Sequence, residues 1–70
     1  MTTTRTQYLV STYNDTPIND AYFTYNRLEA DLLISESIKK GVYGMLIEII
    51  TTENKELDYK KEIRNIIKEF

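Results

Sequence analysis

Cysteine, histidine and tryptophan are absent from this 70-residue sequence, which contains only two glycines and one proline. Without cysteine the chain has no disulfide, thiolate nucleophile or zinc–sulfur site. Without histidine it lacks the side chain that most often serves as general base or nitrogen ligand. The two glycines, Gly41 and Gly44, do not form a phosphate-binding loop. We therefore expect no cofactor, no metal and no enzymatic activity.

The short length predicts a single small domain spanning residues 1–70. A domain of this size buries only about 60% of the surface of its unfolded chain, so its stability is marginal. Small scaffolds usually add a disulfide, a metal or a partner surface. Because the first is absent and the second unsupported, we expect a homo-oligomer or another protein partner. A well-packed monomer is the open alternative.

The charge balance gives no signal for nucleic acid or for an anionic membrane. Nine basic and eleven acidic residues leave a net charge of −2. Residues 1–6 are polar, unlike the apolar core of a signal peptide. Glu48 interrupts the one long apolar run, which is too short to span a bilayer. These features predict a cytoplasmic protein that does not enter membranes.

The densest apolar run, Val42 to Ile50, predicts a mostly buried β-strand. A second strand is expected from Thr4 to Tyr13, which is rich in threonine, tyrosine and valine. Its alternation allows two inward sets of side chains. The preferred set is Tyr8, Val10 and Thr12, and the alternative is Leu9, Ser11 and Tyr13.

Residues 14–20 contain asparagine, aspartate and proline and predict a turn. A calcium loop is the weaker interpretation, because the glycine and final glutamate of an EF-hand are missing. The following segment, Ala21 to Tyr25, predicts a short strand that pairs with the first strand as a hairpin. A helix beginning at Asp20 is the rival interpretation.

The first predicted helix runs from Arg27 to Lys40. Asn26 with Glu29 three positions later has the spacing of a capping box, and Gly41 suits the C-terminal cap. The helical period predicts one broad buried arc along this helix. Leu33 falls outside the arc, and Asp31 and Ser35 fall near its middle. The residues of that arc are Leu28, Ala30, Leu32, Ile34 and Ile38.

A second helix is predicted from Lys55 to Phe70, a segment without glycine or proline. Asn54 or Thr52 is the expected N-cap. A helical wheel places its apolar residues within about 100° of one another. This stripe consists of Tyr59, Ile63, Ile66, Ile67 and Phe70.

Together these segments predict an α+β fold with the element order β-β-α-β-α. The expected sheet has three antiparallel strands in the order 2-1-3, covered by two helices. The third strand would be an apolar edge that needs cover. The odd positions from Tyr43 to Ile49 are expected to face the first helix, which leaves Leu46 and Ile50 to be covered otherwise.

We expect a non-enzymatic protein-interaction module, homodimeric, acting as a small regulator or inhibitor of another protein. A composition rich in isoleucine, lysine, asparagine and tyrosine is typical of AT-rich genomes, which would fit a phage or mobile element. The tyrosines and exposed apolar side chains are the candidate partner contacts. They are Tyr22, Tyr25, Tyr43, Leu46, Ile50, Ile63, Ile67 and Phe70.

Two other functions are weaker alternatives. The predicted second helix carries a basic stripe that would contact phosphates in a nucleic-acid-binding module. Its residues are Lys60, Lys61, Arg64 and Lys68. A small hydrolase using Glu48 and Asp31 ranks last, because a thin sheet rarely encloses a pocket and Glu48 is expected on its open face.

Overall fold

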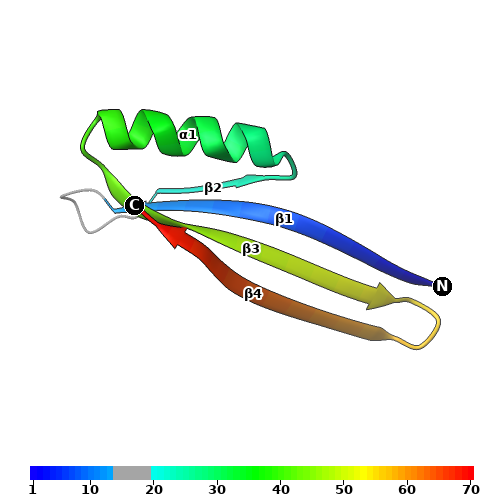
Figure 1. The fold of residues 1–70 in the computed structure, drawn as a ribbon. Coiled ribbons are helices and arrows are strands. Elements are labelled where there is room, and N and C mark those ends of the chain that lie inside the picture. Colours follow the sequence, from blue (N-terminus) through cyan, green and yellow to red (C-terminus); the bar gives the residue numbers. More distant parts are fainter. Residues whose placement is uncertain (14–19) are drawn as a thin grey trace.

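The computed structural model describes residues 1–13 and 20–70 of the chain. Across these residues the chain forms four strands and one helix: β1 (Thr2–Tyr13), β2 (Asp20–Thr24), α1 (Arg27–Lys39), β3 (Tyr43–Asn54) and β4 (Tyr59–Glu69). The strands form one antiparallel sheet in the order β2-β1-β3-β4, with α1 along one side of it (Figure 1). The predicted turn at residues 14–20, and its calcium-loop alternative, fall on the undescribed residues 14–19.

The predicted second helix is wrong, because most of its residues form the strand β4. The expectation of three strands and two helices is therefore replaced by a β-β-α-β-β order. β2, β1 and β3 lie in the order 2-1-3, and β4 extends the sheet beyond β3. The isoleucines of β4 have branched Cβ atoms, which favour strands over helices. Pairing with β3 also covers the apolar edge that β3 would otherwise expose.

The loop between β3 and β4 has hydrogen bonds that resemble those at the start of a helix. The side-chain oxygen of Asn54 accepts hydrogen bonds from the backbone N–H groups of Glu56 and Leu57, at 3.1 and 3.2 Å. These are the bonds that a helix N-cap makes. Here they close a turn. Asp58, the last residue before β4, has a positive φ of 49°, a conformation that aspartate tolerates better than most residues.

The first helix begins and ends close to the predicted residues. Asn26 caps α1 by accepting a hydrogen bond from the Leu28 N–H at 3.0 Å. At the other end, the Val42 N–H donates to the Ser37 carbonyl at 2.9 Å, and Gly41 has a φ of +74°. This is a Schellman cap, whose left-handed position favours glycine.

The buried face of α1 differs from the predicted arc. Ala30 and Ile34 are buried, whereas Leu32 is 68% exposed and Leu28 also faces solvent. Leu33, expected outside the arc, is half-buried. The predicted orientation would have placed Asp31 in the middle of the buried face. The observed one leaves it accessible, paired with the Arg27 guanidinium at 3.2 Å, and so avoids burying a charge.

The hydrophobic core lies between α1 and the middle of the sheet. Its buried members are Val10, Ala30, Ile34 and Leu46, and Tyr8 and Phe70 pack against them. The preferred inward set of β1 is confirmed for Tyr8 and Val10, which lie on the side of α1, while Leu9 of the alternative set is also buried. The expected orientation of β3 is wrong: Leu46 is 0% exposed on the helix side, so the even positions of β3 face α1.

Gly44 allows the chain to close around this core. Its backbone exchanges two hydrogen bonds with Phe70, both 2.9 Å long. A Cβ atom at position 44 would lie 2.7 Å from the Cζ atom of the Phe70 ring and would overlap the Ser11 carbonyl oxygen. A glycine is therefore required where β1, β3 and the end of β4 come together.

Candidate interaction surface

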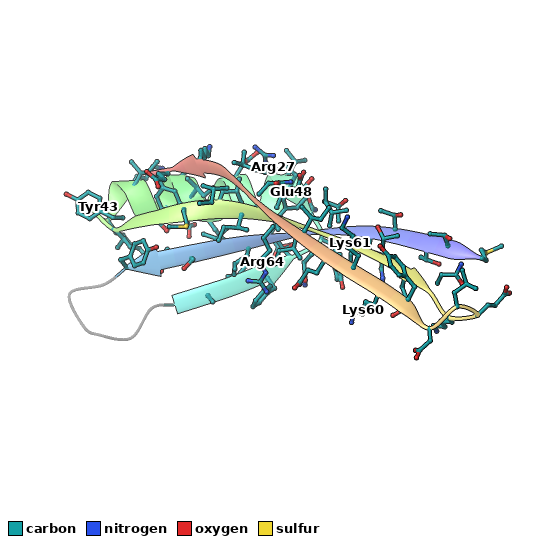
Figure 2. The ribbon with its side chains drawn as sticks, turned by 90° about the horizontal axis from the view of Figure 1, so that it is seen from below. Arg27, Tyr43, Glu48, Lys60, Lys61 and Arg64 are labelled. Carbon is teal, nitrogen blue, oxygen red and sulfur yellow. The ribbon has the colours of Figure 1, made fainter. Side chains whose placement is uncertain are left out.

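The surface feature that distinguishes this fold is the exposed edge strand β4. All residues of β4, Tyr59–Glu69, are exposed. Among the described elements β4 contacts only β3, while α1 contacts β1, β2 and β3. Figure 2 labels Lys60, Lys61 and Arg64 along this strand. Within the described part of the chain, the outer edge of β4 offers its backbone N–H and C=O groups to a further strand.

On the helix side of the sheet, an apolar pair reaches this edge. Ile50 of β3 lies opposite Ile63 of β4 in the register. It shares its face with Leu46, because both occupy even positions of β3. Ile63 is 43% exposed, since α1 does not reach β4. The helix side therefore presents apolar surface next to an edge.

On the opposite, open side of the sheet, an apolar row crosses all strands of the sheet. The register aligns Phe23 of β2 with Leu9, Leu9 with Ile47, and Ile47 with Ile66 of β4. Leu9 is buried although no described element covers this side. The two ends of the row, Phe23 and Ile66, are exposed. Ile66 thus brings the row to the same edge.

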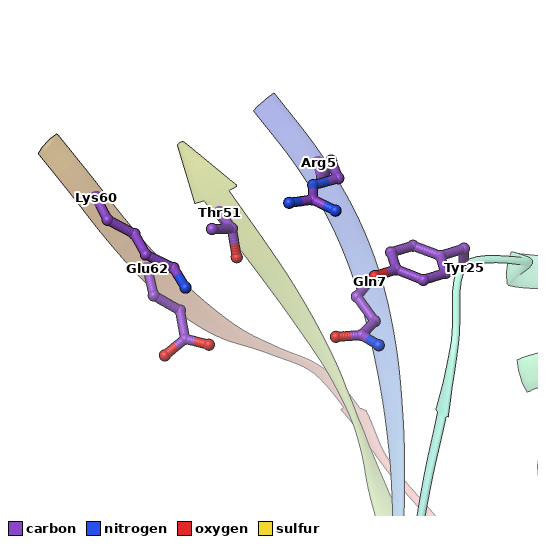
Figure 3. Close-up of a pocket in the computed structure, with 6 residues that line it drawn as sticks. All are labelled: Arg5, Gln7, Tyr25, Thr51, Lys60 and Glu62. Carbon is purple, nitrogen blue, oxygen red and sulfur yellow. The ribbon is translucent and has the colours of Figure 1, made fainter. Parts of the chain in front are cut away.

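The open side also contains a polar hollow of about 510 Å³ (Figure 3). Tyr25 reaches it from beyond the end of β2 and approaches Gln7. Its other lining residues come from three adjacent strands: Arg5, Thr51, Lys60 and Glu62. Its charged residues, Arg5, Lys60 and Glu62, are exposed to water. The hollow therefore offers hydrogen-bonding groups but no water-excluded interior.

The edge of the sheet opposite β4 has a hydrogen-bonded junction between β2 and α1. Glu29 accepts hydrogen bonds from the hydroxyl groups of Tyr22 and Thr24. Thr24 in turn accepts the Asn26 N–H at 3.0 Å. The hydrogen bond to Glu29, with the charge of that carboxylate, raises the pKa of Tyr22 above its usual value of 10.0. These bonds fix the start of the helix over the sheet.

The structure separates the predicted partner contacts into buried and accessible groups. Leu46 is in the core, and Phe70 packs against it. Ile63 and Ile67 lie on the exposed strand β4, with Ile67 at a bulge in the register. Ile50 is half-buried beside Ile63. The exposed tyrosines do not form one group: Tyr22 faces α1, Tyr25 borders the hollow, and Tyr43 shares a strand with neither.

The basic residues of the predicted stripe do not share a face. Because β4 is a strand, Lys60 and Arg64 point to the open side, whereas Lys61 and Lys68 point to the helix side. The stripe required a helix, and the register divides it between the two sides of the sheet.

The two carboxylates of the hydrolase alternative occupy different settings. Asp31 forms its ion pair on α1. Glu48 lies opposite Tyr8 in the register, so it is on the helix side and not on the open face as predicted. Among the described residues, no group of three or more histidine, cysteine, aspartate or glutamate side chains is placed to hold a metal ion.

Sequence reasoning selected Ile50, Ile63 and Ile67 but missed Phe23, Ile66 and Glu62 as parts of the accessible surface. Their positions depend on the strand register, and a helical interpretation of residues 55–70 provides no register.

No protein-family model matches the chain, and no curated protein or solved structure is detectably similar to it. In the described part of the chain, none of the helical structure is long and apolar enough to cross a membrane.

Proposed function

We propose that this chain is a non-enzymatic protein-interaction module that forms a homodimer and acts as a small regulator or inhibitor of another protein. The proposal includes a cytoplasmic location, as expected from the sequence. The observation that carries it is the fully exposed edge strand β4. A long edge strand is a template for pairing with another chain, and proteins rarely leave one open without a use or a guard.

The apolar surface near this edge supports the same function. Ile63 and Ile66 project from opposite sides of β4 and are both substantially exposed. Their neighbours Ile50 and Ile47 extend each apolar surface into the sheet. Association at β4 would remove this surface from water, which favours binding by roughly 25 cal/mol per Å² of apolar area before the costs of association.

The test is the mass of the purified chain in solution. Light scattering and sedimentation at micromolar concentration are expected to give twice the 8.3 kDa mass of one chain, with dissociation on dilution. A mass of one chain throughout that range would refute the homodimer. Capture of a different protein by the immobilised chain, lost with Ile63→Glu but not with Leu57→Glu, would support a regulatory role that depends on β4 or on dimerisation through it. Leu57 is the matched control because it is exposed in the loop before β4.

A further inference from the structure

The arrangement of β4 specifies how two copies would meet. We propose that the β4 strands of two chains pair antiparallel around a two-fold axis at Ile63, joining two sheets into one. This inference rests on the homodimer proposed above and adds its surface and register. In a two-fold interface each residue contact is repeated by symmetry. A residue on the axis therefore meets its own copy, and residues equally spaced on either side of it meet each other.

The charges of β4 favour this register. Glu62 and Arg64 flank Ile63 and lie on the same side of the sheet. Within one chain a guanidinium nitrogen of Arg64 lies 3.6 Å from a carboxylate oxygen of Glu62. Pairing about Ile63 places Glu62 of each chain opposite Arg64 of the other. Opposite charges in facing positions stabilise antiparallel strands, and like charges destabilise them. The dimer gains this favourable contact twice.

Neighbouring registers bring like charges together or lose the opposite-charge contact. An axis at Lys61 would place Lys60 opposite Glu62, but it would also place the two Lys61 ammonium groups opposite each other. An axis at Glu62 would place the two Glu62 carboxylates opposite each other, and an axis at Arg64 would do the same with two guanidinium groups. An axis at Asn65 would oppose Glu62 to Lys68 in a regular strand. However, the register shift between Leu46 and Ile47 breaks the alternation near Ile67. Lys68 and Glu62 therefore point to opposite sides of the sheet.

The apolar surface matches the same axis. On the helix side, Ile63 of one chain would lie next to Ile63 of the second copy, with an Ile50 side chain beyond each of them. This forms an apolar row across the join, in a region that α1 leaves uncovered. On the open side, the aliphatic stem of Lys60 would lie against Ile66 of the facing strand. Long lysine stems cover apolar surface while their ammonium groups stay in water.

The lysines of β4 also bear on the choice of occupant. Lysine on an edge strand commonly prevents pairing. In the register about Ile63, however, Lys60 faces Ile66 and Lys61 faces Asn65, so no ammonium group faces another cation. These charges disfavour the shifted pairings and leave this one open. A second copy of the chain is the partner whose charge pattern is complementary to β4.

The absence of cysteine allows a direct test of the axis. The Ile63→Cys variant is expected to form a disulfide-linked dimer rapidly under mild oxidation, because the two thiols would face each other. The matched control is Asn65→Cys, an exposed residue two positions along the same side of β4. In the proposed register its thiols are too far apart to bridge. Equal or faster cross-linking of Asn65→Cys would overturn the inference.

A charge exchange provides the second test. Glu62→Arg places arginine against arginine twice and is expected to raise the dimer dissociation constant at least about tenfold. The Glu62→Arg/Arg64→Glu double variant restores opposite charges and is expected to return within about threefold of the parent. Failure of the double variant to recover would overturn the register. Circular dichroism of each variant establishes that the fold is retained.

The outcomes separate the register from the proposed function. A parent chain that is monomeric by light scattering refutes both. A dimer in which Ile63→Cys shows no preference over Asn65→Cys refutes only the pairing about Ile63. A dimer that cross-links at Ile63 and recovers on charge exchange supports both.

Discussion

The orientation of α1 can be tested with two substitutions that remove similar apolar volume. Ile34 is 2% exposed in the core, whereas Leu32, on the same helix, is 68% exposed. Ile34→Ala is expected to destabilise the protein by about 2–5 kcal/mol, because it removes buried methyl groups and leaves a cavity. Leu32→Ala is expected to change the free energy of unfolding by less than about 0.5 kcal/mol, and alanine's higher helix propensity offsets part of any loss.

The contrast between these two substitutions is large for a chain of this size. Small domains unfold with free energies near the lower end of about 5–15 kcal/mol, so Ile34→Ala removes a substantial fraction of the total. Urea unfolding followed by far-ultraviolet circular dichroism measures both variants. With a slope of about 1 kcal/mol per M, a loss of 2 kcal/mol lowers the midpoint by about 2 M.

Two controls make the comparison specific to helix orientation. Ile34→Val keeps most of the side chain and is expected to cost about 0.5–1.5 kcal/mol. All variants are compared at one protein concentration, because self-association contributes to apparent stability. If Leu32→Ala cost as much as Ile34→Ala, the buried face would include the arc predicted from the sequence, and the observed orientation of α1 would be refuted.

Two further substitutions test the closure of the core and the β2–α1 junction. Gly44→Ala is expected to lower the free energy of unfolding in urea by at least about 1–3 kcal/mol, because the new Cβ overlaps the Ser11 carbonyl oxygen. Adding Phe70→Leu should not restore stability, because the overlap is with the backbone. An unchanged urea midpoint for Gly44→Ala would contradict this account. Tyr22→Phe removes the hydrogen bond from the Tyr22 hydroxyl to Glu29. This bond stabilises the fold below pH 10.0, the ordinary tyrosine pKa. The stabilisation is lost as the pH rises through the raised pKa of Tyr22 in the folded state. The stability advantage of the parent over Tyr22→Phe should therefore shrink above pH 10.0, and an advantage independent of pH would exclude this explanation.

The first helix could be located from the sequence because its two ends depend on local chemistry. The Asn26 side chain and the left-handed Gly41 act within a few residues of their own positions. The orientation of that helix could not be located in the same way. Several rotations bury a similar number of apolar side chains, and the choice depends on which ones meet Val10 and Leu46 across the sheet.

The error in the second half of the chain has a different cause. The apolar residues of 59–70 recur at intervals of three and four, which is the helical period. Asn54 also makes hydrogen bonds of the N-cap type. Local pattern and local capping therefore agree on a helix. The strand forms because pairing with β3 satisfies a backbone edge and covers apolar residues, and this gain depends on contacts that no single segment displays.

Formation of β4 changes the character of the exposed edge. Without it, the edge strand of the sheet would be β3, which carries a nearly continuous apolar run from Met45 to Ile50 broken only by Glu48. A long, exposed apolar edge of this kind is a site for nonspecific pairing and aggregation. β4 replaces it with an edge in which charges interrupt the isoleucines. Because Glu62 and Arg64 flank Ile63 with opposite charges, that edge can select one register, and the charges that limit nonspecific pairing would also define the specific one.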